Sequence, residues 1–126
     1  MPGLGIALRK LRERRTLSIR ELARLTEIDH AYIYRLEQGE KTSPSPELMA
    51  SLLASLKPAP RDSEIVKWLV DHGDTRDDLV DHCLDDPNVT LEEFTMAAGA
   101  RHRGTVRPTP AELIERVRRA LNPTDE

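Results

Sequence analysis

The sequence predicts an all-α protein, and three observations support this fold class. Apolar residues recur at helical spacing between clear breaks, as Leu4, Leu8 and Leu11 do. Aromatic residues make up only 3% of the chain, so the apolar content comes from Leu, Ala, Ile and Val, which suit small helical cores. Helix-start signals precede most periodic segments, and we identify no strand. The 126 residues allow one compact domain or two small helical units.

The expected helices follow one another in order along the chain. Their start signals are Ser18 with Glu21, Asp29, Ser45 before Pro46, Ser63 with Glu64, Thr75 with Asp78, Thr90 with Glu93, and Thr109 before Pro110. Gly39 can end the third helix. The segment Lys57–Pro60 contains two prolines and predicts a stiff linker. We therefore expect an N-terminal domain at residues 1–57 and a second helical domain at residues 61–126.

Charge is distributed unevenly, although the formal net charge is only −3. Residues 1–43 carry 9 Lys and Arg against 6 Asp and Glu, a net charge of +3. Residues 57–98 carry 4 against 11, a net charge of −7, and residues 99–126 have a net charge of +2. Only the N-terminal third has a balance suited to a phosphate backbone, so the acidic middle should face away from DNA.

Composition also argues against several classes of protein. The single cysteine, Cys83, cannot form an internal disulfide, and we find neither a signal peptide nor a membrane-spanning stretch, so we expect a cytoplasmic protein. His72, His82 and Cys83 lack the spacing of metal ligands, and His30 has no Cys or His at ligand spacing nearby. We expect no metal, no cofactor and no enzymatic activity, with Cys83 as a buried small residue.

Two short helices separated by a tight turn are predicted between Leu17 and Gly39, in the segment LSIRELARLTEIDHAYIYRLEQG. Such a pair can place one helix in a major groove while the other braces it on the backbone. Ala23 is small where the two helices would cross, Ile28 fills the turn, and Ile33 and Leu36 point into the core. The outer face then holds His30, Ala31, Tyr34, Arg35 and Gln38.

This segment resembles the Xre family of helix-turn-helix regulators, the lambda and 434 repressor or Cro type, and the likeness extends from Leu4 through Leu56. The family pattern LS-x-x-E-L-A stands here as Leu17, Ser18, Glu21, Leu22 and Ala23, and the closing hydrophobe-Glu-x-Gly as Leu36, Glu37 and Gly39. The resemblance implies a five-helix Cro/C1-type DNA-binding domain. It also implies a sequence-specific transcriptional repressor that binds operator DNA.

The expected DNA-binding residues combine this outer face with its neighbours. They are Arg20, His30, Ala31, Tyr32, Tyr34, Arg35, Gln38 and Lys41. Arg20 is a phosphate candidate because it lies at the N-terminal turn of a helix, whereas Tyr32 could belong either to the core or to the phosphate contacts. Arg12 and Glu37 look like the structural pair of the family, with Arg12 also able to reach a phosphate.

Two positions depart from the family pattern. The turn position that is commonly Gly is Glu27 here, and positive φ at that residue would cost about 1 kcal/mol. The position near the start of the second helix that is often Gln, and contacts a base, is Ile19. Ile19 can make only apolar contacts, for example with a thymine methyl group.

The second half is expected to hold a homodimer together. One such domain contacts only a few base pairs, so a dimer would engage two half-sites about one helical turn apart. The amphipathic stripe of the last helix, which consists of Leu113, Ile114, Val117 and Leu121, is the predicted dimer interface.

A weaker resemblance covers about forty residues of this half. The elements Asp86-Pro87, Phe94, Arg101 to Pro108 and Leu121-Asn122 are similar to the C-terminal region of DdrO-type damage-response repressors. The likeness implies cleavage by a partner metallopeptidase of the ImmA/IrrE class, for which His102, Arg103 and Gly104 form the expected loop. The alternative is an antitoxin that represses its own operon and binds a toxin through this half. The sequence leaves both partners open, together with the operator and the inducing signal.

Overall fold

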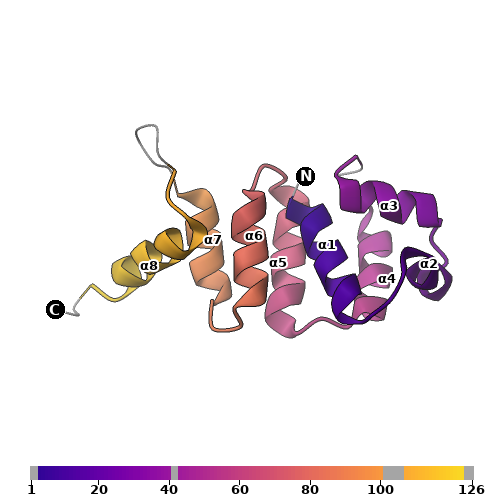
Figure 1. The fold of residues 1–126 in the computed structure, drawn as a ribbon, viewed down its shortest axis with the longest axis horizontal. Helices are drawn as coiled ribbons and strands as arrows, with labels where there is room; N and C mark the ends of the chain where they lie inside the picture. The colour runs from indigo at the N-terminus through magenta and orange to yellow at the C-terminus, as the bar shows by residue number, and fades with distance from the viewer. Residues whose placement is uncertain (1–2, 41–42, 101–106, 124–126) are drawn as a thin grey trace.

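A computed structural model describes residues 3–40, 43–100 and 107–123, and every regular element in these ranges is a helix, which confirms the all-α prediction. The helices are α1 (Gly3–Arg14), α2 (Ile19–Thr26), α3 (His30–Gln38), α4 (Pro46–Leu56), α5 (Pro60–Asp71), α6 (Asp77–Asp85), α7 (Leu91–Gly99) and α8 (Pro110–Leu121). They form an elongated row in which α2, α3 and α4 lie at one end and α8 at the other (Figure 1). No described helix has the length and apolar character needed to cross a membrane.

Most of the predicted helix starts are confirmed by the capping hydrogen bonds. Ser18, Thr90 and Thr109 each accept from the backbone N–H three residues on, and the Glu at that position accepts from the cap in return. Asp29 caps α3 and Ser45 caps α4. These polar residues satisfy backbone groups that the first helical turn would otherwise leave unpaired.

Two expected starts are wrong. The capping box at Thr75 and Asp78 does not form, because the Thr75 hydroxyl donates to the His72 carbonyl at 2.8 Å while Asp78 pairs with the Arg76 guanidinium. The fifth helix begins at Pro60 instead of Ser63, because proline suits the first helical position. Within residues 3–57 the structure describes four helices, α1–α4, one fewer than the five expected for the N-terminal domain.

Helix α1 is held between α3 on one side and α5 and α6 on the other (Figure 1). Two glycines permit this close packing. A Cβ at Gly5 would meet the backbone carbonyls of Leu36 and Glu37, and a Cβ at Gly3 would lie 2.8 Å from Val80. Buried apolar residues of all these helices form one continuous core, so the division at residues 57–61 stays a prediction.

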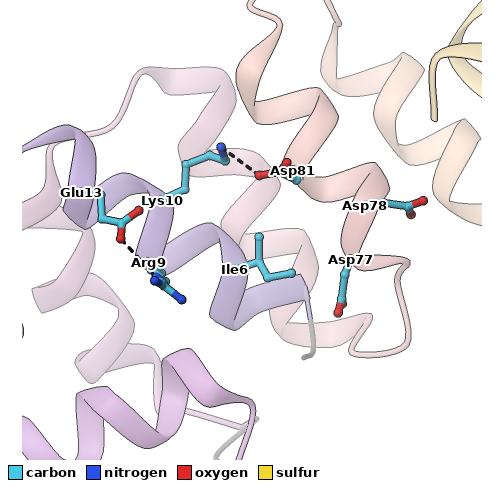
Figure 2. Close-up of a pocket in the computed structure, with 7 residues that line it drawn as sticks. All are labelled: Ile6, Arg9, Lys10, Glu13, Asp77, Asp78 and Asp81. Carbon is cyan, nitrogen blue, oxygen red and sulfur yellow. Dashed lines mark hydrogen bonds and ion pairs between the residues drawn. The ribbon is translucent and has the colours of Figure 1, made fainter. Parts of the chain in front are cut away.

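Ion pairs reinforce the contact between α1 and the acidic helix α6. Lys10 lies 2.9 Å from Asp81 and 2.7 Å from Asp85, and Figure 2 shows it pointing from α1 toward α6. Arg14 continues the contact through Asp62 of α5 at 3.1 Å and through the Leu84 carbonyl. Part of the negative charge of the second half is therefore paired with basic residues of α1.

The last helix packs against α6 and α7 of its own chain. Leu113, Ile114 and Val117 are buried there, with exposed fractions of 6%, 2% and 7%, while Leu121 is half-buried. Helices α6 and α7 cover most of this stripe, and the homodimer itself stays a prediction. Three of the four predicted dimer residues are therefore unavailable to a second chain in this conformation.

Candidate nucleic-acid interface

Helices α2 and α3 form a compact pair joined by three residues, Glu27 to Asp29. Leu22 of α2 and Ile33 of α3 are buried, with exposed fractions of 1% and 2%. Ala23 and Ile28 pack against the same core, as their expected roles at the helix crossing and in the turn require. Helix α3 packs against both α1 and α2, and α4 packs against α2, so the position of α3 is fixed by packing.

The turn between the two helices contains the strained residue that the sequence indicates. Glu27 has φ 60° and ψ 28°, a left-handed conformation that costs a residue with a side chain about 1 kcal/mol. Thr26 partly compensates, because its hydroxyl donates to the Leu22 carbonyl at 2.8 Å and accepts from the Ile28 N–H. The tight reversal that directs α3 away from α2 is therefore kept without glycine.

Helix α3 has one buried face and one exposed face. Ile33, Leu36 and Glu37 are at most 2% exposed, whereas Tyr34 is 51% exposed and Arg35 is exposed beside it. Among the predicted DNA-binding residues, the exposed ones are Arg20, His30, Tyr34 and Arg35, and the half-buried ones are Ala31, Tyr32 and Gln38. Lys41 lies outside the described residues. Tyr32 packs in part against the core, which favours a mainly structural role.

A bidentate ion pair fixes the C-terminal end of α3 to α1. The Nε and Nη2 atoms of Arg12 donate to the Glu37 carboxylate at 2.6 and 2.9 Å, and its Nη1 donates to the Leu17 carbonyl at 2.8 Å. Hydrogen bonding to Glu37 raises the pKa of Arg12. With three donors used inside the protein, Arg12 holds α1, α3 and the start of α2 in register.

Both basic and acidic residues line a shallow hollow between α2 and α3. Its volume is about 620 Å³. The lining residues are Arg20, Ala23, Arg24, Glu27, Ile28, Asp29 and His30. Arg24, which is not among the DNA-binding residues predicted from the sequence, lies one helical turn from Arg20 on the same side of α2 and lines this hollow too. The spacing of four residues between the two arginines was the signal in the sequence that could have identified it.

The other chemically notable side chains do not join this surface. Cys83 is fully buried, and burial raises the pKa of its thiol to about 12. His72 stacks on Trp68, with ring centroids 3.7 Å apart. Across the described ranges, no three His, Cys, Asp or Glu side chains gather as metal ligands would. The expected cleavage loop, His102 to Gly104, lies outside the described residues.

Comparison with known families identifies the N-terminal part of the chain. Residues 4–57 match the family model described as "Helix-turn-helix domain". Comparisons with curated proteins and with solved structures found no match. The matched range begins in α1, contains the α2–α3 pair and ends just after α4. The chain therefore carries a helix-turn-helix domain at residues 4–57, which indicates a DNA-binding regulator.

Proposed function

We propose that this protein is a sequence-specific transcriptional repressor that binds operator DNA as a homodimer in the cytoplasm. The observation that carries the proposal is the two-faced character of α3. Its buried face is locked by Ile33, Leu36 and the Arg12–Glu37 pair, and its opposite face presents Tyr34 and Arg35 to solvent. A rigid helix with a polar exposed face suits insertion into a major groove.

The proposed contacts divide into those that select sequence and those that position the protein. Arg35 can donate two hydrogen bonds to the O6 and N7 atoms of guanine, and the Ala31 methyl group can contact a thymine methyl. Arg20 and Arg24 border the hollow beside α3 and are assigned to backbone phosphates. The positive balance of residues 1–43 supports this orientation.

The homodimer is proposed from the size of the site. A single α3 spans only a few base pairs, and two copies related by a two-fold axis would contact half-sites about one helical turn apart. Because Leu113, Ile114 and Val117 serve the core of their own chain, the interface must use other side chains. Leu121 is the one member of the predicted stripe that remains half-exposed.

Inactivation by cleavage before α8 forms the regulatory part of the proposal. The support for it is the packing of α8, which covers apolar residues of α6 and α7. Loss of that cover would expose apolar surface at the end of the molecule opposite α3 (Figure 1). Cleavage would also remove Leu121, the half-exposed residue of the predicted dimer stripe, and a dimer weakened in this way would release the operator, because both half-sites must be engaged together.

In vitro selection from a random duplex pool tests the proposal. We expect the purified protein to enrich two related half-sites whose centres lie about 10 base pairs apart. Tyr34→Ala combined with Arg35→Ala should lower affinity for the enriched duplex more than affinity for random duplex, by about 10-fold or more. Arg116→Ala, an exposed arginine on α8, is the control and should leave both affinities unchanged. Equal losses on both duplexes, or no enriched sequence, would refute specific recognition by α3.

A further inference from the structure

A cavity of about 470 Å³ lies in the second half of the molecule, away from the helix-turn-helix pair. Its walls come from the end of α5, the turn before α6, the end of α7 and the segment that leads into α8. The lining residues are Trp68, His72, Asp74, Thr75, Arg76, Leu79, Ala97, Ala98, Gly99, Ala100, Arg107 and Leu113. The volume falls within the range of small-molecule sites, and none of these residues has a part in the proposed DNA contact.

One wall of the cavity is aromatic and held rigidly. The rings of Trp68 and His72 are stacked, with centroids 3.7 Å apart and an angle of 3° between planes. His72 Nδ1 lies 2.8 Å from the Trp68 carbonyl, to which it donates in the matching tautomer. Phe94 meets Trp68 edge-on from the core at 5.4 Å. These contacts hold the Trp68 ring in a fixed orientation at the wall of the cavity.

Two guanidinium groups supply the polar part of the lining. Arg76 is held by Asp78 at 2.7 Å and by the Pro108 carbonyl at 2.8 Å. It makes three hydrogen bonds within the described residues, so two of its five N–H groups remain. Hydrogen bonding from Arg76 lowers the pKa of Asp78, and the charge of the exposed Arg107 adds to that shift. A fixed donor and an exposed cation thus line one cavity.

We propose that this cavity binds a small aromatic monocarboxylate, whose ring lies against Trp68 and whose carboxylate accepts hydrogen bonds from Arg107 and Arg76. The apolar floor of Leu79, Ala97 and Leu113 excludes water from the ring of the ligand. Asp78 and Asp74 offset the two arginines of the lining, so the cavity has no net charge, and a ligand with a single carboxylate meets less repulsion there than a polyanion such as a nucleotide. The binding does not depend on DNA and goes beyond the proposed repressor function.

Trp68 gives the binding its own readout, because it is the single tryptophan of the chain. Titrating the full-length protein with 3-phenylpropionate should change the Trp68 emission with saturation, with a Kd on the order of millimolar, as expected for so small a ligand. The neutral 3-phenylpropionamide tests the carboxylate, and butyrate tests the ring. Both should bind at least about 10-fold more weakly, because each lacks one of the two recognised groups.

The assignment of the carboxylate contact is tested by Arg107→Gln. This exposed residue is outside the core, so the variant should fold normally, and its Kd should rise about 10-fold with loss of one charge-assisted contact. Arg116→Gln is the matched control, an exposed arginine on α8 that does not line the cavity. The proposal would be overturned if 3-phenylpropionate caused no saturable change in Trp68 emission at concentrations up to about ten times the expected millimolar Kd. Its affinity would then be at least 1,000-fold weaker than that of a micromolar ligand. Equal binding of acid and amide, or equal effects of the two arginine variants, would also overturn it.

Discussion

Glu37 is a buried carboxylate whose charge is compensated by one residue. Its side chain is 2% exposed and that of Arg12 is 12% exposed. Glu37→Ala would leave the Arg12 guanidinium largely buried without its counter-charge, and such uncompensated charges cost about 3 kcal/mol or more. We expect a loss of that size in the free energy of unfolding, measured by urea denaturation.

Glu115→Ala is the control for this prediction. Glu115 also pairs with an arginine, Arg119, but the two side chains are 66% and 72% exposed, so the pair is screened by water. Its removal should change the free energy of unfolding by no more than about 0.5 kcal/mol. Similar losses in the two variants would mean that Arg12 and Glu37 contribute no more than a surface pair does.

Glu27 gives a second prediction at the scale of one residue. Its φ of 60° is unfavourable for any residue with a Cβ, whereas glycine adopts it freely. Glu27→Gly should therefore be more stable than Glu27→Ala by about 0.5–1 kcal/mol, after allowing for the greater freedom of glycine in the unfolded chain. Thermal unfolding of both variants measures the difference. An alanine variant as stable as the glycine variant would show that the turn carries no strain.

Single residues could be predicted from the sequence where the chemistry is local. Glu27 stands at a turn position with a known backbone requirement, and its left-handed conformation follows from that position. Thr16 and Lys57 also have positive φ, at 54° and 49°, and each follows the end of a helix, where its N–H donates to a carbonyl of the last turn, although neither is the glycine that usually marks such a position. The exposed face of α3 and the shared side of Arg20 and Arg24 on α2 follow from helical periodicity, whereas the hollow that these arginines line depends on how α2 and α3 pack together.

At the scale of the element, α1 depends on its two glycines for close packing. Gly5→Ala would place a Cβ against the backbone carbonyls of Leu36 and Glu37, which cannot move aside as a side chain would. We expect a loss of about 2 kcal/mol, which is typical of overpacking. Gly99→Ala is the matched control, because a Cβ there meets nothing within 4 Å. That change should be neutral or slightly stabilising, so a greater loss at Gly99 than at Gly5 in chemical denaturation would contradict this account of α1.

Helix α8 gives a prediction about truncation. A chain ending at Gly99 loses the cover that Leu113, Ile114 and Val117 provide, each contributing about 1.5–3 kcal/mol through burial. We expect a lower unfolding midpoint and stronger binding of an apolar dye to the exposed core. A chain ending at Pro123, which keeps α8, should behave as the full-length protein does. A Gly99 truncation of unchanged midpoint would show that α8 is dispensable for the core.

The elements show why some expectations held and others did not. Capping boxes involve residues three apart, so Ser18, Thr90 and Thr109 could be identified from the sequence alone. The apparent box at Thr75 failed because Arg76 competes for Asp78, an interaction that the local pattern does not encode. The stripe of α8 was correctly predicted to be buried, but periodicity does not say whether the same chain or a second one covers it.

At the scale of the whole molecule, the stability that three helix caps provide depends on pH, because each cap includes a carboxyl group. The pKa values of Glu21 and Glu112 are lowered by hydrogen bonds from Ser18 and Thr109, and that of Glu93 is lowered by Thr90 and Arg118, which outweigh its burial. A carboxyl with a lowered folded pKa contributes stability above its unfolded pKa and loses it as the pH falls through the folded value. We therefore expect Tm to decline below about pH 4.5.

A variant with Gln at all three capping positions provides the comparison. Glutamine keeps the reciprocal hydrogen bond of the capping box but does not titrate. Its Tm should be lower than that of the parent protein at neutral pH, and the gap should narrow in acid as the three carboxyls become protonated. A gap of constant size between about pH 7 and pH 3 would assign the acid sensitivity to other groups.

The position of α1 also has a consequence for how the chain is made. Helix α1 leaves the ribosome before α5 and α6, the two helices that cover the side of α1 away from α3. The end of α6, at Asp85, lies 71 residues beyond the end of α1. At about 5–20 residues per second, that side stays uncovered for several seconds of translation. The helix-turn-helix segment is complete well before then, so each new molecule passes through a stage in which its DNA-binding face exists on an unfinished core. Synthesis speed between α4 and α6 therefore sets how long a nascent chain is exposed to chaperones and proteases.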